Sequence, residues 1–172
     1  MHLPHKRTLF LSLAAAVLLA LGVWRLRPLP LSALLTVDPA QVTSLACSAN
    51  VAGVLDGEAL IDTYALPTLS PEDEAFSAVL DLLTSTGYRR DFRDLLPWPL
   101  ESVSSGRNYG GRTVNMVLVW GSGAEENCAL SMYDRQVVLF PPGDGGFLIY
   151  HPADPAVFHR LADYLCAHGQ KS

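Results

Sequence analysis

The sequence of 172 residues has little cysteine and few basic residues. Its three cysteines are too few to staple a small fold with disulfide bonds, so a cysteine-rich scaffold is excluded. Twelve Lys and Arg stand against 17 Asp and Glu, giving a net charge of −5. This balance argues against a nucleic-acid partner, because phosphate binding needs a basic surface. With 49% hydrophobic residues, the chain can still fold around one core.

The sequence also lacks the short motifs of metal, nucleotide and hydrolase chemistry. It has no CxxC or HExxH pair to hold zinc and no GxxxxGK[ST] loop to cradle a phosphate. Ser122 lies between two glycines that join expected strands, whereas a hydrolase nucleophile needs GxSxG between a strand and a helix. We therefore expect no metal, no cofactor and no catalytic residues.

One long uncharged run is present at the N-terminus. Thr8–Trp24 has no charged residue, and the charges of Lys6, Arg7 and Arg25 flank it. As a helix the run rises about 26 Å, slightly less than a bilayer core of about 30 Å, and Arg25 would snorkel to the interface. We predict a membrane anchor or signal segment over residues 1–27, with Thr8–Trp24 in the membrane.

The orientation and fate of this segment remain open from the sequence. The basic residues on its two sides differ by about one charge, so the positive-inside rule decides little. A first and only segment with a short leading stretch favours an extracytoplasmic C-terminal domain. The alternative is a cleaved signal with a small-x-small site at Ala20–Gly22, which would release a secreted protein.

The rest of the chain reads as a Pro- and Leu-rich tether over 28–40 and a folded domain over 41–172. The four leucines before Thr36 would lie near the bilayer surface or pack back on the domain. A first strand is expected over 41–50, and a strand followed by a loop over 51–68.

Two helices have clear end signals. Ser70 and Pro71 would be the N-cap and first residue of a helix that Gly87 ends. Asp154 would cap a second helix that runs to Gly169.

Four β-rich runs with turn-type connectors lie between these helices, over residues 113–120, 127–133, 136–140 and 147–151. Their alternating apolar residues predict an antiparallel meander with one covered face. The sequence therefore predicts an α+β fold in which two helices pack on one face of the sheet.

Near the end of the chain, a β-strand leads into a capped terminal helix, in the run CALSMYDRQVVLFPPGDGGFLIYHPADPAVFHRLADYL. In this layout, and in its single N-terminal apolar segment, the chain resembles small uncharacterised extracytoplasmic α+β domains of bacterial membrane proteins and lipoproteins. The resemblance implies a membrane-tethered domain and no particular catalytic residue.

A loop after residue 103 holds the residues that we select as a candidate ligand site. Arg107, Tyr109 and Arg112 lie among small residues, and Trp98 nearby offers an aromatic stacking face. Such a set would suit an anion or a sugar. A surface loop without a ligand is the alternative for the same composition.

The densest basic stretch is Arg89, Arg90 and Arg93. Asp91 and Asp94 interleave with these arginines, so the local net charge is small. We expect a solvated strand edge here, because attraction to anionic lipid headgroups needs more basic residues than this.

The interpretation that results is a single-pass membrane protein whose extracytoplasmic domain binds a ligand or a protein partner, as a sensor or accessory, without catalysis. A secreted ligand-binding protein is one alternative. An exported hydrolase or thiol enzyme using His151, His159 or Cys166 is another. The sequence leaves open whether any two of Cys47, Cys128 and Cys166 form a disulfide.

Overall fold

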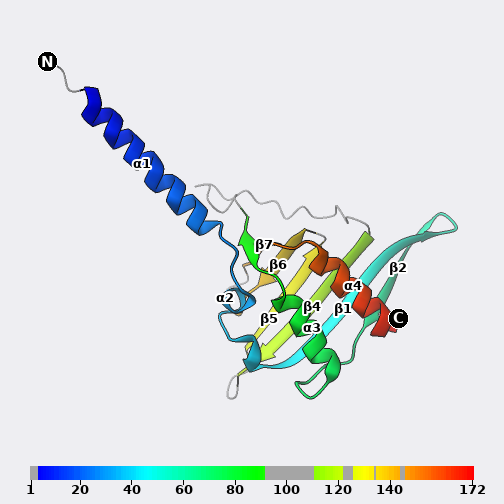
Figure 1. The fold of residues 1–172 in the computed structure, drawn as a ribbon. Helices are drawn as coiled ribbons and strands as arrows, with labels where there is room; N and C mark the ends of the chain where they lie inside the picture. Colours follow the sequence, from blue (N-terminus) through cyan, green and yellow to red (C-terminus); the bar gives the residue numbers. More distant parts are fainter. Residues whose placement is uncertain (1–3, 92–110, 122–125, 134, 144–145) are drawn as a thin grey trace.

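The computed structural model describes residues 4–91, 111–121, 126–133, 135–143 and 146–172. Within these ranges it contains four α-helices and an antiparallel sheet of eight strands, which confirms the predicted α+β class (Figure 1). In chain order the elements are α1 (Pro4–Arg25), α2 (Leu31–Leu35), η1 (Pro39–Gln41), β1 (Val42–Leu55), β2 (Glu58–Ala65), α3 (Glu74–Thr84), β3 (Tyr88–Arg90), β4 (Arg112–Trp120), β5 (Glu126–Tyr133), β6 (Gln136–Phe140), β7 (Leu148–Pro152), α4 (Ala156–His168) and β8 (Gln170–Lys171).

The strands lie in the order β3-β7-β6-β5-β4-β1-β2-β8. Strands β4 to β7 are neighbours in sequence order, so the predicted meander is confirmed. The expectation of a strand plus a loop over 51–68 is incomplete, because β1 continues to Leu55 and the chain returns as β2 before the loop that follows Ala65. Asp56 and Gly57 join the two strands with φ angles of 53° and 87°. An Asp-Gly pair adopts such left-handed angles readily, which closes a tight hairpin.

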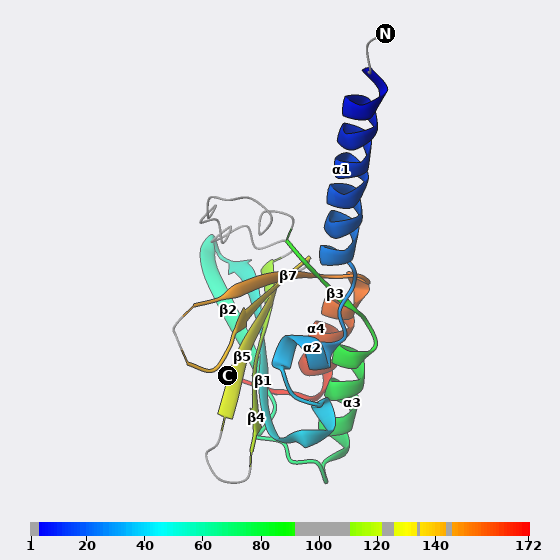
Figure 2. The same cartoon turned by 90° about the vertical axis from the view of Figure 1, so that its left-hand side faces the viewer.

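One face of the sheet is buried under helices (Figure 2). Alternate residues of β4 and β5 point to this face, among them Met116, Leu118 and Leu130, which are at most 2% exposed. Phe158 of α4 and Val79 of α3 are fully buried against them. The predicted packing of two helices on one face is therefore confirmed, and the short helix α2 adds to this layer.

The Pro- and Leu-rich segment 28–40 packs back on the domain. Leu31, Leu34 and Leu35 of α2 are buried in the same core as α3 and α4. Leu29 and Tyr88 exchange two backbone hydrogen bonds of 2.8 Å, so the segment also pairs with β3. The segment that follows α1 is thereby tied to one edge of the sheet.

The first residues of α3 differ from the prediction. The helix begins at Glu74 rather than at Pro71, because Asp73 has an extended backbone (φ −83°, ψ 131°) and is itself the N-cap residue. The Asp73 carboxylate accepts hydrogen bonds from both the amide and the hydroxyl of Ser70. These two bonds hold residues 70–73 as a turn, and they keep the pKa of Asp73 below its usual value. At α4 the N-cap residue is Pro155 rather than the predicted Asp154, and the Asp154 side chain accepts a 3.0 Å hydrogen bond from the amide of Ala156, the first residue of the helix.

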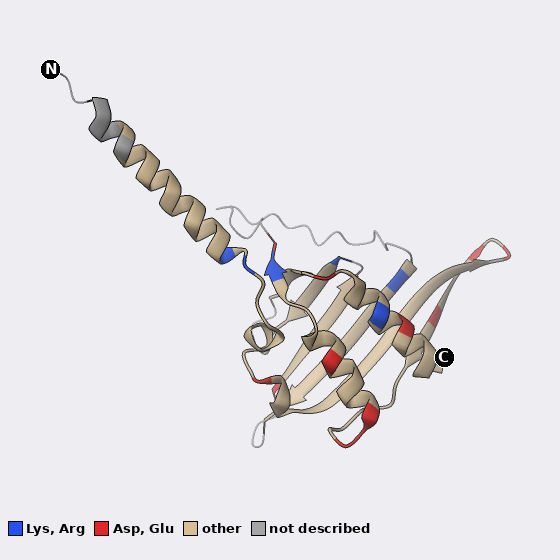
Figure 3. Cartoon of the chain, viewed as in Figure 1, with Lys and Arg blue, Asp and Glu red and all other residues tan. Residues whose placement is uncertain are grey.

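Helix α1 points away from the domain, and its 22 residues include the uncharged run (Figures 1 and 3). Its large apolar side chains are exposed on several sides, for example Phe10 at 72% and Leu19 at 70%. Within the described parts of the chain, no helix combines the length and hydropathy that a membrane crossing needs. The transmembrane helix expected over Thr8–Trp24 is therefore not supported, and this uncharged run alone is shorter than a bilayer core.

Alanine variants of Leu118 and Val117, which are neighbours in β4, test whether the core lies on one face of the sheet. Leu118→Ala removes a fully buried side chain and should lower the free energy of unfolding by about 3 kcal/mol. Val117 is 39% exposed on the opposite face, so Val117→Ala should cost about 1 kcal/mol or less. Urea unfolding of the full chain, followed by circular dichroism, measures both values. Equal losses for the two variants would contradict the one-sided core.

Candidate functional site

The face of the sheet opposite the helices is the main candidate surface, and we call it the open face. Strand register places Ser48, Asn115, Ser131, Val138 and Ile149 in one continuous row on this side of the sheet, from β1 to β7, and Val138 is buried within it. The next row holds Ala46, Val117, Ala129 and Phe140. Both rows are free of charge, and short side chains make up most of them.

A depression of about 320 Å³ lies on the open face, between β1, β4 and β5. The short side chains of Ala46, Ser48, Ala129 and Ser131 line it and account for its depth. Ser131 donates a hydrogen bond of 2.9 Å to the Oδ1 atom of Asn115, so the Asn115 amide nitrogen is the donor that this side chain can offer to a ligand. The volume lies near the lower limit of small-molecule sites.

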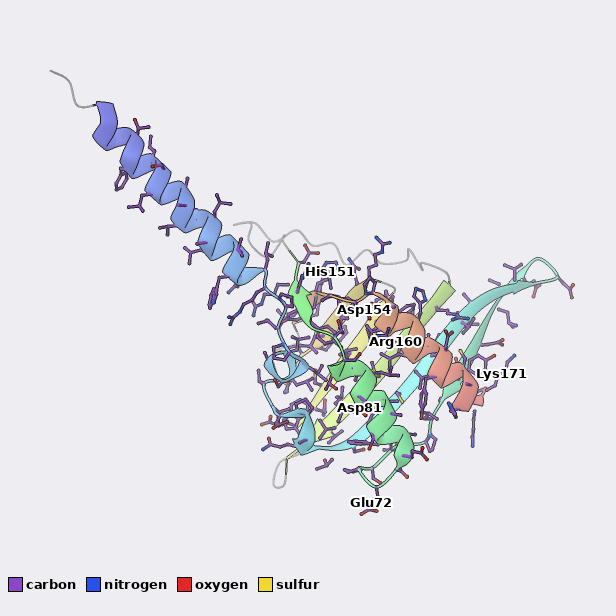
Figure 4. The ribbon with its side chains drawn as sticks, viewed as in Figure 1. Glu72, Asp81, His151, Asp154, Arg160 and Lys171 are labelled. Atoms are coloured by element: carbon purple, nitrogen blue, oxygen red, sulfur yellow. The ribbon has the colours of Figure 1, made fainter. Side chains whose placement is uncertain are left out.

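His151 on β7 is held by oxygen acceptors at both ring nitrogens. Its Nδ1 atom lies 2.7 Å from the backbone oxygen of Arg135, and its Nε2 atom lies 3.1 Å from the Asp91 carboxylate. The Asp91 side chain is only 4% exposed, and that of His151 is 36% exposed. A general base needs a ring nitrogen that can reach substrate. This geometry engages both nitrogens, so it favours a structural role at the edge where β3 joins β7 (Figure 4).

The other residues considered for catalysis do not come together. His159 and Asp163 both lie on α4, but Asp163 accepts a 2.7 Å bond from Arg112 of β4. His168 packs against the ring of Tyr164 at a centroid distance of 4.5 Å. In the described ranges, no group of three His, Cys, Asp or Glu side chains could hold a metal ion.

All three cysteines are free thiols, which answers the question of a disulfide within the chain. Cys47 and Cys128 are buried under the helices, and burial raises the pKa of each thiol to about 11. Thiols with such a pKa are poor nucleophiles near neutral pH. Cys166 lies half-buried on α4.

Only one residue of the sequence-predicted ligand site falls in the described ranges. Trp98, Arg107 and Tyr109 lie outside them. Arg112 lies on β4, where its guanidinium pairs with Asp163 at 2.7 Å while its side chain keeps 37% exposure. The ion pair thus links Arg112 to α4, and the ligand site itself stays a prediction.

Sequence reasoning missed the open face as a candidate site. The signal is present in β5, where Ala129 and Ser131 alternate with buried Cys128, Leu130 and Met132. Short outward-facing side chains on one strand predict a hollow only when the side chains beside them on the neighbouring strands are also short. That knowledge requires the β1–β4–β5 register, which no local pattern gives.

Comparison of the chain with protein-family models, curated proteins and solved structures found no match. The resemblance to extracytoplasmic domains of bacterial membrane proteins therefore rests on the sequence layout alone.

The contact between His151 and Asp91 should contribute to stability. His151→Ala removes a hydrogen-bond donor from a carboxylate that stays buried, so we expect a loss of about 2 kcal/mol in the free energy of unfolding. Arg160→Ala is the matched control, because its pair with Asp154 is half exposed on both sides and should contribute about 0.5 kcal/mol. Urea unfolding of the wild type and the two variants measures these losses. Equal losses in the free energy of unfolding would contradict a special contribution from the contact with buried Asp91.

The three thiols should differ in reactivity with iodoacetamide. With a pKa of about 11, about one Cys47 or Cys128 thiol in a thousand is ionised at pH 8, and both are buried. We expect one label in the native chain, at Cys166, and three after unfolding. The ionised fraction of the two buried thiols should rise tenfold per pH unit up to about pH 11. Mass spectrometry of the wild type and of Cys166→Ser reads the labels, and native labelling of Cys166→Ser would contradict this assignment.

Proposed function

We propose that the protein is held at a membrane by α1 and that its folded domain is a non-catalytic binding module on the extracytoplasmic side. The observation that carries the binding role is the open face, which presents an uncharged hollow while helices cover the other face of the sheet. The engaged His151 ring and the buried Cys47 and Cys128 thiols support a role without catalysis.

The membrane part of the proposal rests on the surface of α1. Apolar side chains such as Leu11, Leu18 and Val23 are exposed on α1. Moving one such side chain from water into an apolar environment is favourable by about 1.5–3 kcal/mol. A surface of this kind marks a membrane or partner contact. Arg25 at the end of α1 can reach the charged interface of a membrane on which these side chains lie.

The open face favours an uncharged partner surface. Its two rows offer hydroxyl and amide groups at Ser48, Asn115 and Ser131, flanked by the apolar Val117 and Phe140. Val117 and Phe140 are 39% and 42% exposed, so they are accessible to a partner. Hydrogen bonds from the central groups would orient the partner, and the apolar rim would supply contact area.

Fractionation of cells that produce the full chain tests the membrane part. We expect the chain to keep Thr8–Trp24 and to stay in the membrane pellet after alkaline extraction. Leu18→Arg combined with Leu19→Arg should release it, because both residues are exposed on α1 and lie outside the domain core. A soluble chain that begins near Val23 would support the secreted alternative, whereas a soluble full-length chain would contradict membrane attachment.

In the same cells, a photo-crosslinking residue at Val117 tests the binding part. We expect it to give a discrete adduct that the same group at Asp81, exposed on α3, does not give (Figure 4). Adducts of equal yield from both positions, or from neither, would contradict the open face as the binding surface.

A further inference from the structure

Arginines from two distant parts of the sequence meet at the base of α1. Arg25 is the last residue of α1, and Arg27 follows it after one residue. Arg89 lies on β3, which is tied to this region by the paired backbone hydrogen bonds between Leu29 and Tyr88. The three side chains are exposed. We call Arg25, Arg27 and Arg89 the arginine collar.

The collar borders an apolar groove of about 850 Å³. Leu18, Leu19 and Val23 form its wall along α1, and Arg27 and Arg89 close the end next to the domain. The Arg27 guanidinium lies 5.2 Å from the centroid of the Trp24 ring, a cation–π contact that helps to hold it there. The groove is thus apolar along its length and basic at one end.

The charge pattern of the domain agrees with this placement. Figure 3 shows basic residues around the end of α1, whereas much of the acidic charge lies toward the far end of α3 and the tip of the β1–β2 hairpin. Asp91 directly follows β3, but its carboxylate is buried and bonded to His151. Among the residues that the structure describes, the exposed charges next to the end of α1 are therefore basic, in a chain whose net charge is −5.

We propose that the arginine collar binds the phosphate headgroups of anionic phospholipids, with an acyl chain in the groove along α1. This inference rests on the proposed membrane attachment of α1. Arginine suits phosphate because its planar guanidinium donates two parallel hydrogen bonds to the oxygens. The apolar wall of α1 is continuous with the collar, so one lipid molecule meets both parts at once. A basic residue at an anionic surface strengthens association by about fivefold.

The test compares two spin-labelled lipids around the full chain reconstituted in phosphatidylcholine vesicles. Electron paramagnetic resonance gives the fraction of labelled phosphatidylglycerol, and of labelled phosphatidylcholine, that the protein immobilises. We expect a preference of at least about threefold for phosphatidylglycerol, which 0.5 M NaCl weakens. Arg27→Gln combined with Arg89→Gln should remove most of this preference. Arg160→Gln combined with Lys171→Gln changes the net charge equally, away from α1, and should leave it unchanged.

The outcomes separate the two proposals. If the wild type immobilises both lipids equally, or if the Arg27 and Arg89 variant keeps the full preference, the collar is overturned while membrane attachment stands. Equal loss of preference in the control variant would show an effect of net charge only, which also overturns the collar. If the full chain fails to float with vesicles of either lipid, membrane attachment itself fails.

Discussion

Packing of α3 and α4 against one face of the sheet is the interaction on which the other features of this protein depend. It requires apolar side chains at every second position of β4 and β5, and these residues form the core. The intervening positions are then left to the open face, where none of the described helices constrains their size or polarity. The hollow is lined by the short side chains of Ser48, Ala129 and Ser131 on that face.

Local patterns account for the parts of the fold that were predicted correctly. The alternation along β4 and β5 identifies both the meander and its covered face, because a side-chain period of two allows only one choice of face. The start of α4 is predicted to within one residue from an equally local signal, since the bond from Ala156 to the Asp154 side chain spans two residues. By contrast, the predicted start of α3 is three residues too early, because the backbone of Asp73 is extended although its bonds to Ser70 are those that a capping box would make.

The features that were missed depend on pairing between distant segments. The sequence shows Arg89 as part of a mixed-charge stretch, and only the bridge between Leu29 and Tyr88 brings it beside Arg27. The contact between Asp91 and His151 arises in the same way, from the pairing of β3 with β7. Such contacts join residues about 60 positions apart, and periodicity carries no information at that separation.

The two proposed surfaces differ in direction, so one does not block the other. In Figure 2, α1 leaves the domain at one end, and β4 and β5 run roughly along the same direction, so the sheet stands upright relative to α1. The arginine collar lies at that end and would meet lipid headgroups. The open face looks sideways and stays accessible when the collar is occupied. Headgroup binding would restrict rotation of the domain about the end of α1, which lowers the entropy lost when a partner docks on the open face.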